Sequence, residues 1–227
     1  MDRPVGPSVE IYSAQHPPRT TFAGRAVHLE PLDPRHTDDL YEAVGKPEYA
    51  ALWTYIPKNR SEDKAGFTEL IASLATSTDP VFYAIILQST KKAVGFFSLM
   101  RIDTTNRVVE IGFIIFSPAL QRTTAATEAF YLLARAVFED LGYRRFEWKC
   151  DNLNAPSKRA AARFGFTEEG VFRQHLIVKG RSRDTAWFSI LDSEWPALRS
   201  SFDKWLDPGN FDADGNQRSS LNALRNQ

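Results

Sequence analysis

Residues 117–130, SPALQRTTAATEAF, combine a polar turn with the start of a helix in a way that suits anion binding. They follow the apolar run VVEIGFIIF (108–116) and lead without a helix breaker into TEAFYLLARAVFEDLG. A helix start leaves backbone N–H groups unpaired and carries partial positive charge, so this layout can hold a phosphate. The turn contains no glycine, and most such turns bind nothing, so the turn alone does not establish a ligand.

Three other side chains are of types that can move or stabilise a proton. Glu110 lies inside the apolar run, where loss of water should raise the pKa of its carboxyl group. His175 belongs to the residue type that titrates near neutral pH. Ser157 stands near the start of an expected helix. Each also has an ordinary structural alternative: a glutamate paired with an arginine, a hydrogen-bonded strand histidine and a plain helix-start serine.

Hydrophobic periodicity predicts the elements that hold these side chains. Strand-like runs come first and are followed by strand, helix, strand, helix and strand, which indicates a mixed sheet covered by helices. The expected strands are GRAVHLEPL, VFYAIIL, AVGFFSLM, VVEIGFIIF, RRFEWKC, VFRQHLIV and DTAWFSIL. The expected helices are DPRHTDDLYEAV, a segment from Ser61 onward, TEAFYLLARAVFEDLG, APSKRAAARF and DSEWPALRSSFDKWL.

One folded domain is expected over residues 22–206, since a chain of this size can bury a large core without staples. Residues 1–21 mix Pro, Gly and Ser with little periodicity and are predicted to form an irregular arm. Residues 207–227 are rich in Gly, Asn and Asp and are predicted to be a mobile tail.

Composition argues against several classes of function. The 28 basic and 28 acidic residues cancel, so no global field draws the chain to nucleic acid or to a membrane. We find no apolar signal core and no apolar run near 20 residues, and expect a soluble, cytoplasmic protein. The single cysteine, Cys150, suits a reducing compartment and is expected to be a buried strand residue. The four histidines show no metal spacing, so no metal is expected.

Four motifs occur in a telling order: VEIGF in a strand, a loop ending ATEA, an N-x-N-x-x-S segment leading into ARFGF and EEG, and a late G-x-x-x-D before an aromatic strand. In this order the block from about 108 to 192 resembles the GNAT acetyltransferase superfamily, in particular the branch of the RimJ and RimL ribosomal-protein N-terminal acetyltransferases. The resemblance implies the GNAT fold, an α/β (α+β mixed) fold. Its mostly antiparallel, seven-stranded mixed sheet is splayed in the middle and flanked by helices.

The resemblance also implies where acetyl-CoA, the expected cosubstrate, would bind. The family's pyrophosphate loop reads Gln or Arg, two residues, Gly, one residue, then Gly or Ala, and Thr124 here replaces the first glycine. The pantetheine arm lies in the gap of the sheet, against free backbone groups of the strand before the loop. The implied cosubstrate-binding residues are Phe113, Ile114, Ile115, Phe116, Gln121, Arg122, Thr123, Thr124, Ala125, Ala126, Thr127, Asn152, Asn154 and Ser157.

The implied catalytic residues are Glu110, Ser157 and His175. Glu110 matches the glutamate that serves as base in several relatives, and Ser157 stands where the family stabilises the thiolate of CoA. In the RimL-like branch the base is a later glutamate, whose position here is close to Leu176, so His175 beside it is an alternative base.

The implied acceptor-binding residues are Trp53, Tyr55, His175 and Asp184. Trp53 and Tyr55 lie where this family builds the wall of its acceptor pocket, and Asp184 is the late family aspartate. Asp184 is expected either to face the substrate or to fix a loop.

These inferences predict an N-acetyltransferase that transfers an acetyl group directly to a primary amine. A free α-amine has a pKa near 7.7–8.0 and lysine one near 10.4, so a modest base suits an α-amine better. A peptide N-terminus, an aminoacyl conjugate and a small-molecule amine all remain open, as do acyl-chain length and the choice between monomer and homodimer. The departures at Thr124 and Leu176 motivate an alternative, a non-catalytic acyl-CoA-binding sensor or scaffold.

Overall fold

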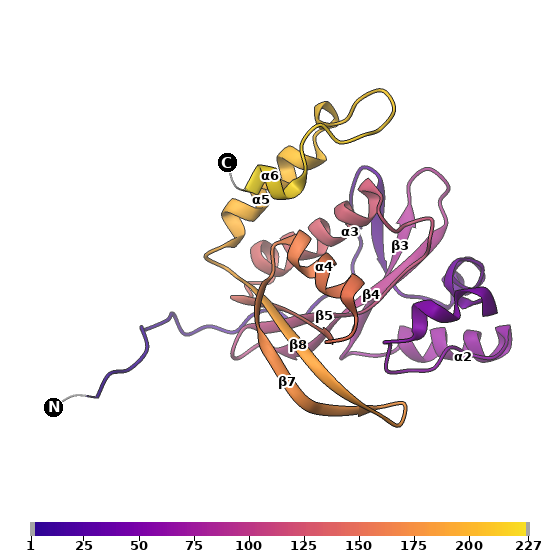
Figure 1. The fold of residues 1–227 in the computed structure, drawn as a ribbon, viewed down its shortest axis with the longest axis horizontal. Coiled ribbons are helices and arrows are strands. Elements are labelled where there is room, and N and C mark those ends of the chain that lie inside the picture. The colour runs from indigo at the N-terminus through magenta and orange to yellow at the C-terminus, as the bar shows by residue number, and fades with distance from the viewer. Residues whose placement is uncertain (1–2, 226–227) are drawn as a thin grey trace.

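The computed structural model describes residues 3–225, which form one eight-stranded sheet with helices packed on both faces (Figure 1). The strands are β1 (Phe22–Ala23), β2 (Val27–Pro31), β3 (Val81–Leu87), β4 (Ala93–Asp103), β5 (Val108–Phe116), β6 (Arg145–Asp151), β7 (Thr167–Val178) and β8 (Arg181–Leu191). The α-helices are α1 (Thr37–Leu40), α2 (Lys64–Ala75), α3 (Thr124–Arg135), α4 (Ala155–Phe164), α5 (Trp195–Leu206) and α6 (Leu221–Arg225). The 3₁₀ and π turns are η1 (Pro34–His36), η2 (Tyr41–Gly45), η3 (Pro47–Trp53), η4 (Ala136–Asp140) and η5 (Pro208–Asn210).

The strand order is β1-β2-β3-β4-β5-β6-β8-β7, and only β5 and β6 pair in parallel. The predicted mixed, mostly antiparallel sheet is therefore confirmed. It has eight strands rather than the seven expected, because the chain before β2 turns back at Gly24, whose N–H donates to Val27 O. Phe22 and Ala23 thereby pair with β2 as a short edge strand.

Alternate residues of a strand point to opposite faces of the sheet, and at β3 both faces are buried. Tyr83 belongs to the core beneath α3 and α5, whereas its neighbour Phe82 belongs to a second core with Phe67 and Ile71 of α2. Figure 1 shows α3 and α4 together over one part of the sheet, with α2 apart from them. This double burial explains why VFYAIIL is apolar at every position.

The sheet opens between β5 and β6, as the resemblance predicted. Their parallel ladder covers only 108–111 opposite 145–148, although both strands continue beyond it. On the β4 side, three steps along β5 from Gly112 to Ile115 face two steps along β4, so β5 carries one extra residue. Phe113 in this bulge has a φ of 52°, in the left-handed region. The bulge turns β5 away from β6 at the point where the ladder ends.

Glu128 ties α3 to the edge of the sheet. Its carboxylate is 7% exposed and accepts the backbone N–H groups of Arg25, Ala26 and Val27 at 2.8, 2.6 and 3.0 Å. A buried carboxylate is stable only when such donors surround it. The turn between β1 and β2 is therefore held by a helix residue about a hundred positions later.

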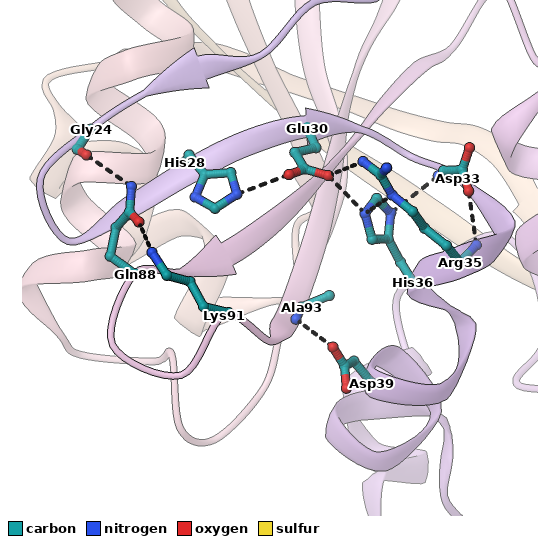
Figure 2. Close-up of polar contacts among 10 residues, drawn as sticks. All are labelled: Gly24, His28, Glu30, Asp33, Arg35, His36, Asp39, Gln88, Lys91 and Ala93. Atoms are coloured by element: carbon teal, nitrogen blue, oxygen red, sulfur yellow. Dashed lines mark hydrogen bonds and ion pairs between the residues drawn. The ribbon is translucent and has the colours of Figure 1, made fainter.

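A second polar cluster ties β2 to the turn that follows it (Figure 2). Glu30 contacts His28 Nε2 at 2.9 Å and His36 Nε2 at 3.1 Å, and it also accepts a hydrogen bond from Arg35. Asp33, the expected helix-start residue, caps η1 by accepting the N–H of Arg35 at 2.9 Å. Although burial raises it, hydrogen bonds from His36, Arg35 and His28 hold the pKa of Glu30 below its ordinary value.

The two ends of the described chain lie against the body at several points. Before β1, the backbone N–H groups of Ala14 and Gln15 donate to Thr104 O and Leu141 O. After α5, Leu221 of α6 is 1% exposed, and Arg225 donates to Ala162 O. The composition predicted a mobile tail in this last part. The division into arm, domain and tail remains a prediction, and residues 1, 2, 226 and 227 lie outside the described part.

Replacing Glu30 by Gln should lower the free energy of unfolding by about 1–3 kcal/mol at pH 7, because three charge-assisted contacts weaken. A carboxyl group with a depressed folded-state pKa contributes stability above its unfolded-state pKa and loses it as pH falls through the folded-state value. The difference between wild type and Glu30→Gln should therefore shrink below a pH of about 4. Urea titrations at several pH values measure this, with exposed Glu69→Gln as control. A difference independent of pH would contradict the assignment.

Candidate active site

The predicted anion loop lies at the start of α3, and Thr123 caps that helix. Its hydroxyl accepts the N–H of Ala126 at 3.1 Å and donates to Leu120 O at 2.6 Å. The left-handed position in this loop is Arg122, with a φ of 61°, whereas Thr124 is the first residue of α3 and is right-handed. Threonine therefore fits at the first glycine position without backbone strain, and its N–H remains at the helix start.

Several of the predicted cosubstrate-binding groups have partners inside the protein. The Gln121 side chain donates from Nε2 to Phe116 O at 2.8 Å, which occupies one of the strand carbonyls expected to be free. Thr127 is 1% exposed and accepts a hydrogen bond from Arg163 at 3.0 Å, which links α3 to α4. Arg122 is exposed beside them. Backbone groups of 113–115 and 124–125 remain the best candidates for contact with a bound cosubstrate.

Glu110 lies on the face of the sheet opposite α3, in a group of buried charges. It is 5% exposed, and Lys149 Nζ lies 3.0 Å from its Oε2. The same ammonium lies 2.6 Å from Glu147 Oε2 and 3.9 Å from the centroid of the Trp187 ring. Arg101 Nε lies 3.5 Å from Glu110 Oε2. Burial raises the pKa of Glu110, and the charges of Lys149 and Arg101 limit the rise.

The charged group continues across the next strands. Arg145 Nε donates to Glu147 at 2.8 Å and Arg145 Nη1 donates to Glu169 of β7 at 2.7 Å. Ser189 of β8 donates to the same Glu169 at 2.8 Å. Acidic and basic side chains thus alternate from β5 through β6 to β7, with Ser189 of β8 between them. Each charged side chain lies beside one of opposite charge, which stabilises it.

The start of α4 places Ser157 on the opposite face of β6. Asn154 caps this helix by accepting the N–H of Ser157 at 3.2 Å, so it acts as an ordinary N-cap. Trp148 Nε1 donates to Ser157 Oγ at 2.9 Å, which leaves the hydroxyl proton of Ser157 available to another acceptor. Cys150 is buried nearby, as expected, and burial raises the pKa of its thiol while the Ser157 hydroxyl opposes the rise.

Asn152 and Asp184 hold the backbone around β7 and β8. Asn152 accepts a hydrogen bond from Lys158 Nζ at 2.8 Å, and its N–H donates to Asp184 O at 2.9 Å. Asp184 Oδ1 accepts the N–H of Gln174 at 2.7 Å, where β7 bulges and Gln174 has a φ of 49°. The geometry of Asp184 is that of a loop-fixing carboxylate.

This bulge forms a hollow of about 650 Å³ lined by Phe172, Arg173, Gln174 and His175. His175 Nδ1 lies 3.0 Å from Thr185 Oγ1, and its ring centroid lies 5.9 Å from that of Trp187. Trp187 packs on Phe172 and His175, which line the hollow, and its ring also stacks on Lys149 beside Glu110. His175 and Glu110 are thus brought to the same region of the sheet.

Of the two predicted pocket residues, Trp53 is buried in a core and Tyr55 is only half-buried. Trp53 is 2% exposed, packs in the second core and donates from Nε1 to Val44 O at 2.8 Å. Tyr55 is half-buried, and its hydroxyl donates to Leu153 O at 3.3 Å. At the tip of the β7–β8 hairpin, Lys179 Nζ donates to Trp53 O at 2.7 Å. These contacts join the segment after η3 to both sides of the site.

The sequence reasoning missed Lys149, Glu147 and Arg183. A signal was present, since RFEWKC alternates charged and apolar residues, and period two places its charges on one face. That alternation predicts a strand but does not by itself show that the charges are buried. Within residues 3–225, no group of three or more His, Cys, Asp or Glu side chains has the arrangement of a metal site. In the same range, no helix is long and apolar enough to cross a bilayer.

Comparisons with known proteins agree on one family. A family model described as "Acetyltransferase (GNAT) domain" matches residues 26–167. The crystal structure of a GCN5-related N-acetyltransferase from Brucella melitensis is 46% identical, with a TM-score of 0.92 over 95% of this chain and 99% of that one. A probable GNAT-family acetyltransferase from Chromobacterium violaceum is 40% identical, with a TM-score of 0.78 over 86% of this chain and 100% of that one.

A third relative carries a more specific name. The putative ribosomal N-acetyltransferase YdaF of Bacillus subtilis is 34% identical over 101 residues, which are 44% of this chain and 55% of that protein.

Replacing Lys149 by Met should destabilise the fold by about 3–5 kcal/mol, because two buried carboxylates lose the cation between them. Adding Glu147→Gln to Lys149→Met removes one of those charges and should recover part of the loss. Urea unfolding of the single and double variants measures both effects. If Lys149→Met unfolds with wild-type free energy, the ammonium does not hold these carboxylates.

Proposed function

This chain belongs to the GNAT acetyltransferase family and is an acyltransferase, and we propose that it moves an acetyl group from acetyl-CoA to a primary amine. The amine nitrogen attacks the thioester carbonyl, a C–N bond forms and the C–S bond breaks. The amine loses a proton, and CoA leaves as the thiolate or thiol. No covalent intermediate on the protein is needed.

The opening between β5 and β6 is the observation that carries this proposal. An extended chain with amide groups can bind in such an opening as a substitute strand, and the pantetheine arm of acetyl-CoA has that character. The helix start at 123–126 lies directly after β5, where its N–H groups and Arg122 favour a diphosphate. The protein therefore offers free backbone groups of β5 for the pantetheine arm and, at the start of the next helix, an anion site for the diphosphate.

Glu110 is the proposed proton acceptor. Glu110 belongs to the part of β5 that is still paired with β6. Burial raises the pKa of its carboxyl group and so brings that pKa closer to the pKa of an amine. The charges of Lys149 and Arg101 favour the ionised carboxylate of Glu110, which is the form that accepts a proton. His175 remains the alternative acceptor, because it lines the adjoining hollow.

Ser157 is proposed to stabilise the leaving thiolate. Trp148 already donates to Ser157 Oγ, so the hydroxyl can donate its own proton either to the nearby Cys150 sulfur or to an incoming acceptor. The thiolate of CoA, arriving at the β6 side of the opening, is such an acceptor. One hydrogen bond of this kind favours departure without full proton transfer.

A cosubstrate-binding protein without catalysis is the alternative. The replacement of glycine by Thr124 is one argument for this alternative. That argument is weak, because the left-handed position of the loop is Arg122 and not Thr124. The buried carboxyl group of Glu110, whose pKa is raised by burial, favours catalysis over sensing.

Purified protein should bind coenzyme A in calorimetry and release thiol from acetyl-CoA when a suitable amine is present. The panel should include a peptide with a free N-terminus, small-molecule amines and an amine-free blank. Acceptor-dependent thiol release supports the transferase. Binding of CoA without any acceptor-dependent release would favour the sensor, and absence of binding at millimolar CoA would overturn both.

Glu110→Gln should lower kcat/KM about 10²–10⁴-fold, because general base catalysis is worth that much. In wild type, activity should fall as the pH drops through the raised pKa of Glu110, and that acidic decline should vanish in the variant. Rates from pH 5 to 9 at saturating acetyl-CoA measure this, with exposed Glu168→Gln as the matched control. If His175→Ala removes the decline and Glu110→Gln does not, the base is His175.

A further inference from the structure

Three buried polar atoms beside the proposed acceptor site have no aligned hydrogen bond within residues 3–225. They are Glu110 Oε2, Trp187 Nε1 and Arg183 Nε. Glu110 Oε2 has nearby cations, as described, but the two nitrogens are donors without any acceptor. A buried donor left unpaired costs about 1–3 kcal/mol, so native proteins rarely keep one without a reason.

The two unpaired donors lie on the face of the sheet that carries Glu110. Trp187 pairs in register with Lys149, whose side chain contacts Glu110. β8 is regular through this stretch, so Arg183, two steps beyond Thr185 and four beyond Trp187, points to the same face. Thr185 in turn contacts His175 in the hollow.

Arg183 differs from the other buried cations of this face. Lys149 and Arg145 each lie between two carboxylates, whereas Arg183 forms no ion pair in the described part of the chain. Its cross-strand partner is Leu176, whose side chain cannot accept a hydrogen bond. Burial lowers the pKa of Arg183, while Asp151 and Glu110 favour its charged form. The guanidinium remains charged because its pKa stays far above neutrality.

Asp151 does not neutralise this charge directly. Its Oδ1 accepts the N–H of Leu153 at 2.9 Å, and it forms no ion pair with Arg183. A half-buried cation with an unpaired N–H, on the same sheet face as an unpaired indole N–H, is complementary to an anion with oxygen acceptors.

We propose that Arg183 and Trp187 form a subsite for a carboxylate group of the acceptor, so that the acceptor is a small amino carboxylate. Its amine faces Glu110, and its carboxylate accepts hydrogen bonds from the guanidinium and the indole. The hollow lined by Phe172 and His175, on which Trp187 packs, is large enough to admit such a molecule. This inference rests on the proposed function, and it favours a free amino acid over a peptide N-terminus, whose first carbonyl is uncharged.

The test uses three acetylated fragments that resemble the transfer product: N-acetylglycine, N-acetylglycinamide and N-methylacetamide. Binding of each to the protein with CoA is measured by NMR titration. We expect N-acetylglycine to bind at least about tenfold more tightly than the other two, because only it carries the charge that Arg183 recognises. Equal affinities, or no binding of the acid at 50 mM (roughly the weakest range a fragment of this size would show), would overturn the proposal.

Arg183→Met should bring the affinities for the acid and the amide within about threefold of each other, whereas exposed Arg181→Met on the same strand should preserve the preference. Arg183→Lys keeps the charge without the Nε donor and should give an intermediate preference. Trp187→Phe should weaken binding of the acid by a smaller factor. A preference for the acid that survives Arg183→Met would overturn the assignment.

The affinity for CoA, measured in parallel, separates this inference from the proposed function. All three Arg variants should bind CoA like wild type, because Arg183 lies on the acceptor side. Normal CoA binding with no preference for the acid overturns only the carboxylate subsite. Loss of CoA binding in wild type overturns the proposed function, while the fragment preference still reports on Arg183.

Discussion

The short pairing between β5 and β6 is the constraint on which the site depends. Parallel strands normally stay paired over their common length, but here the ladder stops after Ile111 because β5 carries an extra residue at its bulge. The left-handed backbone of Phe113 turns the strand, and the Phe113 ring packs on Phe82 at a centroid distance of 5.3 Å. The second core thus holds the strained strand in place, and the sheet keeps a backbone edge free for a ligand.

Burial of charge gives the acceptor face its character. Lys149, Glu147 and Arg145 alternate along β6 with the aromatic residues that face the other way, so one strand serves a polar wall and an apolar core. Desolvating so many ions is costly, and each is tolerated because opposite charges lie within about 3 Å. Arg183 breaks that pattern, since it forms no ion pair with any other residue of the described range 3–225.

The sequence predicted most of the sheet and the loop before α3, since both leave local signals. Alternating or continuous apolar runs mark strands, and Thr123 marks a helix start with a side chain that satisfies one backbone donor. The two-residue β1 left no such signal, because its pairing depends on a turn held from afar by Glu128. The sequence left the place of Trp53 open for a related reason: a tryptophan in a loose segment reads the same whether it lines a pocket or fills a core.

Two hydrogen bonds to main-chain oxygens close the site at its far side, one from Tyr55 to the loop before α4 and one from Lys179 to Trp53 O. Neither donor belongs to β5 or β6, and each acceptor is a carbonyl that any residue type supplies. Substitutions around these contacts would therefore reshape the proposed acceptor side and leave the opening between β5 and β6 intact. With this separation, selectivity for the proposed acceptor would change through surface loops alone, without any change in the paired strands.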